Sequence, residues 1–392
     1  MFNRVGLLLV LALTLSVHPA HAQQRVVLPE SAFRAAGLER RWVTVLPVGG
    51  LQDRVRAAAV VEDLFVVQTK QRATHVVDVE TGRLLYSVEG QATVQGKPAV
   101  AVNGEAVFTF KGPNLMRYNR NTGVLEWRIY LDQSPWSPLV ANAEYVYFGT
   151  VQGRLYAIPT QRNVPGIQKW FAQLYAPVDA APLAHLQWVV VGSTDGLVYV
   201  FPTRSRNVVF RYRVNDEVIV PAVAYQNNLF VASRDGYVYS VDIRTGETFW
   251  RYPVGDGVSE PMLLATNGAQ QYQLFVVSES RILYCMDPLT GEELWNVPNV
   301  NRLVAASKTR LYVEGPTRDL RILSRSDGSA VALLPTHGIE FVVFNSYSDR
   351  ILLVSASGVA VMASEPGAEK PTYHRPLSRP EAVGEANPPS EQ

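Results

Sequence analysis

A short phrase of hydrophobic and polar residues recurs along most of the chain. An apolar stretch is followed by a tight turn carrying Thr-Gly or a similar pair, and an aromatic residue comes three or four positions later. The phrase is clearest from Asp242 to Trp250 and from Asp287 to Trp295. Regular self-similarity of this length predicts a repeat architecture in which each repeat is one structural unit. The turns fall at Gly82, Gly123, Gly166, Asn207, Gly246, Gly291, Gly328 and Gly367, which are 37 to 45 residues apart.

Each repeat contains the signals of four strands. A proline opens an apolar stretch upstream of the phrase, as at Pro182 and Pro221, and proline is tolerated at the first residue of a strand because it has no N–H to donate. Glycine-containing turns such as 192–196 follow, and they predict hairpins. The sequence therefore predicts an all-β protein made of four-stranded antiparallel units.

The two ends of the repeat region favour a closed ring. A unit of about 40 residues cannot bury both faces alone, and radial stacking hides these faces while leaving only short edges. The last unit has strands predicted at 341–344, 351–355 and 359–363 but no fourth strand, whereas 37–46 offers a fourth strand with none before it. We predict an eight-bladed β-propeller over residues 37–363, closed by this N-terminal strand. Seven blades are the alternative if the weak unit at 301–334 is misread.

The segments outside the ring have a different character. Residues 1–22 have the features of a secretory signal peptide, with Arg4, an apolar stretch of about 13 residues and a small-x-small cleavage pattern at 20–22. We expect a lead segment at 23–36 and a disordered proline-rich tail at 364–392. The mature protein should be exported, periplasmic or extracellular, with no transmembrane span after removal of the signal.

Composition and charge exclude several classes of protein. The chain has 36 Lys and Arg against 35 Asp and Glu, so it lacks the basic footprint of a nucleic-acid-binding protein. The single cysteine, Cys285, rules out an intramolecular disulfide and any cluster of thiolate metal ligands. A hydrophobic fraction of 47% is enough for a large core.

The recurring phrase resembles the tryptophan-docking repeat of pyrroloquinoline-quinone-like (PQQ-like) propellers. The resemblance covers roughly residues 37–367 and is specific for the fold. In such repeats the tryptophan of one blade packs against the neighbouring blade, and the Asp and Thr hold the turn through hydrogen bonds to the backbone. The predicted structural residues of this docking motif are Asp78, Thr81, Gly82, Gly123, Trp127, Gly166, Trp170, Asp242, Gly246, Trp250, Asp287, Gly291 and Trp295.

The resemblance implies two different functions. The family includes quinone-dependent alcohol dehydrogenases, and it includes the non-enzymatic propeller of the outer-membrane β-barrel assembly machine. The dehydrogenases carry an adjacent pair of cysteines against the cofactor and a calcium ion, and a chain with one cysteine cannot supply that pair. We therefore expect no cofactor and no catalytic or metal-binding residues. The cysteine that would carry a lipid anchor after the signal is also absent, which departs from the assembly-machine pattern.

Two features of the loops are candidates for binding. Five acids precede proline-opened strands in three successive units, where they could form an acidic funnel at one end of the axial channel: Asp179, Asp216, Glu217, Asp256 and Glu260. Trp136 lies outside the docking phrase, between two Ser-Pro pairs, and is a candidate interface residue.

A rigid disc with variable loops favours a binding role, because function on such scaffolds is carried by the loops. We predict a monomeric, non-catalytic scaffold that binds an envelope or secreted protein. The alternative is a PQQ-dependent dehydrogenase or another propeller enzyme that uses the acidic funnel.

Overall fold

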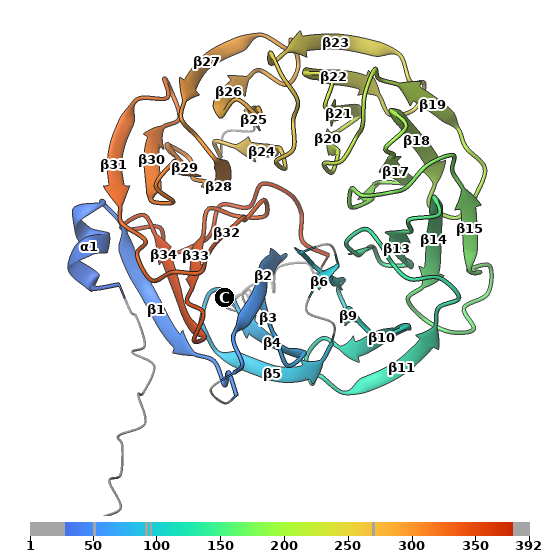
Figure 1. Ribbon diagram of the computed structural model, residues 1–392, viewed down its shortest axis with the longest axis horizontal. Helices are drawn as coiled ribbons and strands as arrows, with labels where there is room; N and C mark the ends of the chain where they lie inside the picture. Colours follow the sequence, from blue (N-terminus) through green and yellow to red (C-terminus); the bar gives the residue numbers. More distant parts are fainter. Residues whose placement is uncertain (1–27, 50–51, 91–92, 95, 269–270, 379–392) are drawn as a thin grey trace, which may run out of the picture.

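The computed structural model describes residues 28–49, 52–90, 93–94, 96–268 and 271–378. The predicted signal peptide at 1–22 lies outside the described residues, as do 23–27 of the lead segment and 379–392 of the tail. Eight four-stranded antiparallel sheets stand side by side around a central axis (Figure 1). The predicted eight-bladed propeller is confirmed, and the seven-bladed alternative is wrong because 302–334 forms a complete blade.

The first four blades follow the chain from the axis outward. Blade 1 contains β2 (Val55–Val61), β3 (Leu64–Thr69), β4 (Ala73–Asp78) and β5 (Leu84–Glu89), and blade 2 contains β8 (Val100–Val102), β9 (Ala106–Lys111), β10 (Asn114–Asn119) and β11 (Leu125–Tyr130). Blade 3 contains β12 (Val140–Ala141), β13 (Tyr145–Gly149), β14 (Arg154–Pro159) and β15 (Trp170–Gln173), and blade 4 contains β16 (Leu183–His185), β17 (Trp188–Gly192), β18 (Leu197–Pro202) and β19 (Phe210–Arg213).

The other four blades continue around the ring. Blade 5 contains β20 (Val223–Tyr225), β21 (Asn228–Ala232), β22 (Tyr237–Asp242) and β23 (Thr248–Pro253), and blade 6 contains β24 (Leu263–Thr266), β25 (Tyr272–Val277), β26 (Ile282–Met286) and β27 (Glu293–Pro298). Blade 7 contains β28 (Arg302–Ala306), β29 (Arg310–Glu314), β30 (Leu320–Ser324) and β31 (Ala330–Leu334). Blade 8 contains β32 (Phe341–Val343), β33 (Ile351–Val354), β34 (Val359–Ser364) and β1 (Glu39–Val45).

The N-terminal strand closes the ring as predicted. β1 pairs antiparallel with β34, and Trp42 lies opposite Met362 in the sheet that also holds Leu353. The innermost strands are shorter than predicted. β16 and β20 begin one and two residues after Pro182 and Pro221, so these prolines lie before the strands instead of opening them.

The blades are held together by one contact that repeats around the ring. At six junctions between described blades, the aromatic residue of one blade packs on the next, and its polar atom donates a hydrogen bond to a backbone carbonyl there, whereas Phe210 of blade 4 packs on Gly246 without such a bond. The indole Nε1 of Trp42 donates to Val79 O at 2.8 Å, and that of Trp250 donates to Pro288 O at 3.0 Å. The same bond joins Tyr86 to Arg120 O, Trp127 to Thr160 O, Trp170 to Thr203 O and Trp295 to Arg325 O.

Glycine is required where the aromatic ring lies against the turn. Gly291 has φ +76°, and a Cβ there would lie 2.5 Å from the ring of Trp250. The turn itself is held by Asp287, whose carboxylate accepts the N–H groups of Leu289 and Thr290. Gly166 differs, because a Cβ at its position would meet no atom within 4 Å. Glycine is therefore required there only by the backbone conformation, because no aromatic ring lies against it.

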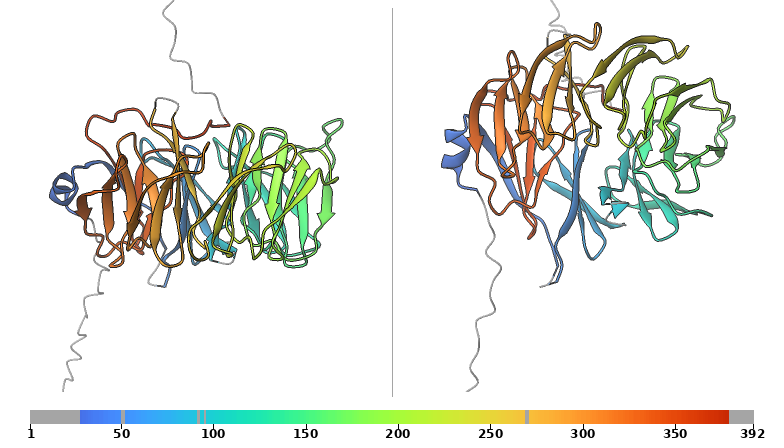
Figure 2. Two further views of the ribbon diagram at one scale, coloured as in Figure 1. Left: turned by 90° about the horizontal axis from the view of Figure 1, so that it is seen from above. Right: turned by 45° about the horizontal axis from the view of Figure 1, so that its top comes forward.

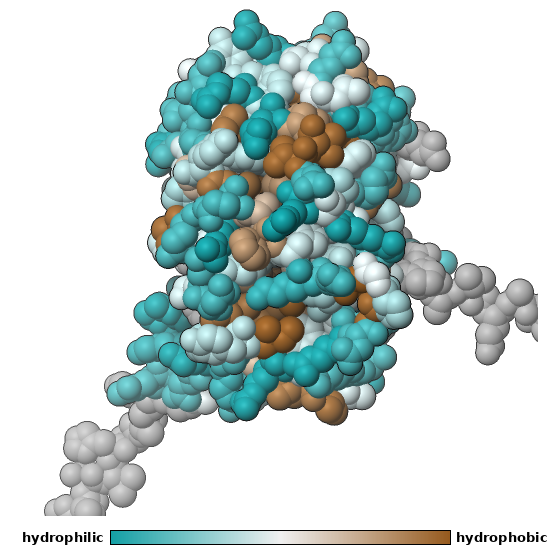
Figure 3. Space-filling view, turned by 90° about the vertical axis from the view of Figure 1, so that its right-hand side faces the viewer, coloured by the Kyte–Doolittle hydropathy of each residue, from teal (hydrophilic) through white to brown (hydrophobic). Residues whose placement is uncertain are grey.

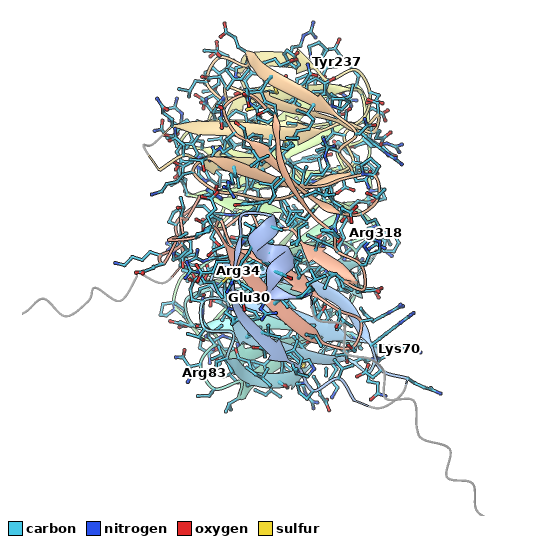
Figure 4. All side chains as sticks on the ribbon, turned by 90° about the vertical axis from the view of Figure 1, so that its left-hand side faces the viewer. Glu30, Arg34, Lys70, Arg83, Tyr237 and Arg318 are labelled. Carbon is cyan, nitrogen blue, oxygen red and sulfur yellow. The ribbon has the colours of Figure 1, made fainter. Side chains whose placement is uncertain are left out.

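The blades define two flat faces of the disc. Turns between the first and second and between the third and fourth strands of a blade lie on one face, and the remaining connections lie on the other. Figure 4 shows this division: Arg83 lies on one face, Lys70 and Arg318 lie on the opposite face, and α1 lies on the rim between them. We call the face with Arg83 the strap face and the face with Lys70 the loop face.

The predicted disordered tail is wrong for its described part. Residues 365–378, which we call the strap, run across the strap face towards the axis (Figure 2, left). The Glu365 carboxylate accepts bonds from Ser307 and Tyr312 of blade 7. At the other end, Ser378 donates through N–H and hydroxyl to the Glu62 carboxylate of blade 1, at 3.0 and 2.8 Å. The composition suggested disorder, but these polar contacts with turns of other blades order the segment.

The lead segment also covers the junction between blades 7 and 8. The helix α1 (Glu30–Ala35) contacts β31 and β1 on the rim. Its Phe33 is fully buried in the core shared by blades 7 and 8, which explains why so short a helix stays in place. Arg310 joins both ends of the chain, because its side chain donates to Gly37 O and forms an ion pair with Glu365.

The glycine contacts give a matched pair of variants. Gly166→Ala should lower the free energy of unfolding by about 1–2 kcal/mol, the ordinary cost of a left-handed L-residue. Gly291→Ala should cost about 1–3 kcal/mol more, because its methyl group also collides with Trp250. Both free energies of unfolding can be measured by urea titration, with near-ultraviolet circular dichroism to monitor unfolding. Equal losses for the two variants would contradict the proposed role of ring packing on Gly291.

His374 should make attachment of the strap depend on pH. Its Nε2 donates to Ala306 O at 3.0 Å, while Nδ1 is buried without a partner among the described atoms. Burial, together with the charges of Arg325 and Arg375, lowers the pKa of the imidazole to about 4. Between about pH 6.5 and pH 4, the free strap therefore binds more protons than the attached strap. The contribution of His374 to the free energy of attachment is complete above pH 6.5 and is lost as the pH is lowered towards 4.

Hydrogen exchange of residues 365–378 at pH 7 and pH 4.5 measures this effect. Protection should fall at the lower pH by up to about 3 kcal/mol, the value of a shift of this size at 1.36 kcal/mol per pKa unit. His374→Gln can still donate to Ala306 O and does not titrate, so its protection should change much less. An equal loss in the variant and the parent would show that another group controls the strap.

Candidate interaction surface on the loop face

Three connections on the loop face meet around the turn of blade 3. The turn at 150–153 joins β13 to β14, and the connections at 131–139 and 174–182 lie on either side of it. The backbone N–H of Trp136 donates to Gly149 O at 2.8 Å, and that of Leu174 donates to Gly153 O at 2.7 Å. These bonds fix two irregular segments to a rigid hairpin, which is how a β scaffold positions loop side chains.

Two of the predicted binding residues meet at this place. The indole Nε1 of Trp136 donates to the Asp179 carboxylate at 2.7 Å, across 43 positions in the sequence. Both residues are binding candidates from the sequence alone, but no local pattern in the sequence connects them. Because the bond holds one edge of the ring and the side chain remains 36% exposed, Trp136 presents an oriented apolar surface to solvent.

A second exposed aromatic residue, which is not among the predicted binding residues, lies in the connection that carries Asp179. Tyr175 is 77% exposed in the same connection as Asp179, and the Arg211 guanidinium lies 5.8 Å from its ring centroid. Val151, 42% exposed, lies in the intervening turn. A tyrosine outside the docking phrase was the only signal available in the sequence. We call Trp136, Val151, Tyr175 and Asp179 the Trp136 surface.

The rim next to this surface carries only small apolar patches. Figure 3 shows the rim on this side of the disc, where brown apolar groups are separated by teal polar ones. Phe171 on β15 is 42% exposed, and the Arg154 guanidinium lies 5.0 Å from its ring centroid. Such a mixture lacks the continuous apolar area of an obligate interface, so binding here depends on a few anchoring side chains.

The five predicted acids are interleaved with basic groups. Glu217 forms an ion pair with Arg234, which also pairs with Glu279 of the next blade. Asp216 accepts the N–H of Glu217, and Asp256 accepts a bond from the Ser280 hydroxyl. The acids therefore make local contacts around the loop face. The predicted acidic funnel did not include the basic residue Arg234, which pairs with one of these acids.

Lys97 lies between two of these acids. It belongs to a small hairpin, β6 (Thr93–Val94) and β7 (Lys97–Pro98), in the connection between blades 1 and 2. Its ammonium lies 3.5 Å from Asp179 O, and it interacts electrostatically with Glu260 of the connection between blades 5 and 6. Burial lowers the pKa of Lys97, with the charges of Asp179 and Glu260 opposing the shift, and burial raises the pKa of Glu260. Asp179 is the main compensation for the buried charge of Lys97, and Arg302 is the main compensation for that of Glu260.

The residues present do not fit the quinone site of the related dehydrogenases. The lone cysteine, Cys285, is fully buried on β26, where desolvation raises the pKa of its thiol to about 12. Within the described part of the chain, no group of three or more His, Cys, Asp or Glu residues is arranged to hold a metal ion. The adjacent cysteine pair that stacks on the quinone has no counterpart in the sequence.

Comparison with known proteins agrees with the predicted resemblance. The sequence matches the PQQ-like family model described as outer membrane protein assembly factor BamB over residues 27–162 and 213–341. No curated protein matches the sequence. Across the described residues, no helix has the length and apolar character that crossing a membrane requires.

Solved structures show the same fold at low identity. The crystal structure of BamB from Moraxella catarrhalis is 17% identical with a TM-score of 0.64, and the alignment covers 83% of this chain and 99% of that one. The crystal structure of the computationally designed Ika8 protein is 16% identical with a TM-score of 0.63, covering 80% and 97% of the two chains. At these identities the likeness establishes the propeller fold alone.

Proposed function

The chain belongs to the BamB family of PQQ-like β-propellers, and on this basis we propose that it is a non-catalytic scaffold that binds a protein of the cell envelope through the Trp136 surface. The family model carries the name of an outer membrane protein assembly factor, which favours an envelope location and a protein partner. The signal-like segment at 1–22 supports export to the periplasm or beyond.

The observation that carries this proposal is the bond between Trp136 and Asp179. An exposed tryptophan loses little rotamer entropy on binding when a hydrogen bond already holds its ring. Aromatic residues supported in this way are the residues that dominate the free energy of association in protein interfaces. Because the bond uses the indole N–H, the outer edge and face of the ring remain available to a partner.

Tyr175 and Arg211 extend the same surface with amphipathic groups. Tyrosine and arginine are both enriched in interfaces, since each offers a broad apolar area with a polar end. Lys97 and Asp179 supply charges of opposite sign beside them. A partner that fits is therefore a polypeptide with an apolar residue at its centre and polar groups of both signs around it. We propose that the protein acts as a monomer that holds such a partner.

Replacement of the anchor tests the proposal directly. The mature protein should capture a specific protein from an envelope extract of its own organism, and titration with that purified protein gives the dissociation constant. Trp136→Ala should weaken binding by at least about tenfold, as expected for a central aromatic anchor. Trp136→Phe, which keeps a ring but loses the bond to Asp179, should give an intermediate loss.

Leu186→Ala is the matched control. Leu186 is 65% exposed, but it lies in the first turn of blade 4 on the opposite face, so its removal should leave the dissociation constant unchanged. Equal binding by the parent and both Trp136 variants would reject the surface. A rise in melting temperature on adding quinone and calcium, together with turnover of an alcohol, would instead support the dehydrogenase alternative.

A further inference from the structure

A buried guanidinium in blade 7 has no carboxylate partner. Arg325 is 3% exposed, and its side chain donates to Gln273 Oε1 and to the carbonyl oxygens of Ala265, Thr266 and Ser307 at 2.6 to 2.8 Å. All four acceptors are neutral. No ion pair of this arginine occurs in the part of the chain that the structure describes. Its positive charge is thus buried against neutral dipoles and the ring of Phe275, whose centroid lies 5.5 Å from the guanidinium carbon, and desolvation lowers the pKa of Arg325 to about 10.

The equivalent position in blade 2 has the acids that blade 7 lacks. Arg120 follows β10 as Arg325 follows β30, and both carbonyl oxygens accept the aromatic donor of the preceding blade. Arg120 is likewise buried, but it pairs with Glu62 at 2.7 Å and with Asp63. Both acids lie in the turn between the first two strands of the preceding blade. In blade 2, therefore, acids of the chain itself neutralise the buried arginine, whereas in blade 7 they do not.

The corresponding turn before blade 7 is free of acids. It runs from Asn267, the counterpart of Glu62, to Gln271, and its sequence holds no Asp or Glu. A cavity of about 680 Å³ opens on the strap face beside this turn, and both Arg325 and Lys308 line it. Lys308 is exposed and forms no ion pair with a described residue. The acid in the lining, Asp287, uses its carboxylate to hold the turn at 289–290.

The same cavity also has apolar residues in its lining. Leu289 and Leu294 are 61% and 49% exposed, and the rings of Tyr225 and Tyr272 lie with their centroids 4.3 Å apart. All four residues line the cavity. A ligand that fills it must therefore bring both an anionic group and an apolar group. Alternating side chains of an extended peptide segment have this arrangement.

We infer that this cavity binds an acidic, extended segment of a partner polypeptide, whose carboxylate supplies near Arg325 the negative charge that Glu62 and Asp63 supply to Arg120 in blade 2. Lys308 contacts the carboxylate directly, and the buried charge of Arg325 adds an attraction that water screens weakly. The leucines and the tyrosine pair contact the neighbouring apolar side chain. The site lies on the strap face, opposite the Trp136 surface, so one scaffold can hold two polypeptides at once.

A synthetic peptide provides the probe. A fluorescein-labelled seven-residue peptide that alternates leucine and aspartate should bind the full-length protein, with anisotropy as the readout. The same peptide with asparagine in place of aspartate should bind at least about tenfold more weakly, because it cannot compensate the cations. Raising the salt concentration should weaken the aspartate peptide more than the asparagine peptide.

Two variants separate the roles of the cations. Lys308→Gln should weaken the aspartate peptide by about three- to fivefold, as expected for an exposed ion pair, whereas Lys70→Gln on the loop face should have no effect. Asn267→Asp restores the acid of the blade 2 site within the chain. It should reduce peptide affinity at least about tenfold while the urea midpoint is retained or raised, which shows that the variant folds.

Several outcomes would overturn the inference. One is equal affinity for the aspartate and asparagine peptides, and another is unchanged binding in both Lys308→Gln and Asn267→Asp. Displacement of the peptide by inorganic phosphate at the peptide's own concentration would identify a site for small anions instead. If a chain ending at Ser378 bound the peptide at least tenfold more tightly than the full chain, the occupant would be this protein's own residues 379–392, which carry three glutamates.

Discussion

The structure depends on the packing of an aromatic ring from one blade on the turn of the next. The contact combines burial of a large apolar surface with a hydrogen bond from the ring to a backbone carbonyl, as for Trp250 on Gly291 and Pro288 O. Each blade exposes two sheet faces that it cannot cover alone, so contact between blades supplies most of the burial. Repetition of the same contact fixes the spacing of neighbouring blades and leaves their connections free to vary.

A ring built in this way has one junction that differs from the others. Blade 8 is assembled from both ends of the chain, so its closure depends on segments about 320 positions apart in sequence. The structure reinforces this junction with additional contacts. The helix α1 covers the rim between blades 7 and 8, and the strap connects the turns of blades 7, 8 and 1 across one face. Arg350, buried in blade 8, adds an ion pair to Glu80 of blade 1.

The two faces of the disc differ in their chemistry because different loops form them. On the loop face, long connections between blades place Trp136, Tyr175 and interleaved charges around a rigid hairpin. On the strap face, the turn between the first two strands changes in length and charge from blade to blade, since 62–63 holds two acids and 267–271 holds none. The contrast between Arg120 with its two acids and Arg325 with none follows from such a change. The fold is shared with BamB from Moraxella catarrhalis.

Local patterns in the sequence are enough to predict the architecture. The spacing of Thr-Gly turns and aromatic residues predicts the blades, and the missing fourth strand of the last unit predicts closure by the segment containing Trp42. Tertiary structure alone decided which side chains meet. Trp136 and Asp179 are 43 positions apart, and their bond exists because two connections lie on the same hairpin. Likewise, a proline-rich composition predicts disorder, but residues 365–378 are ordered by Glu62 and Ala306, partners that no local pattern can identify.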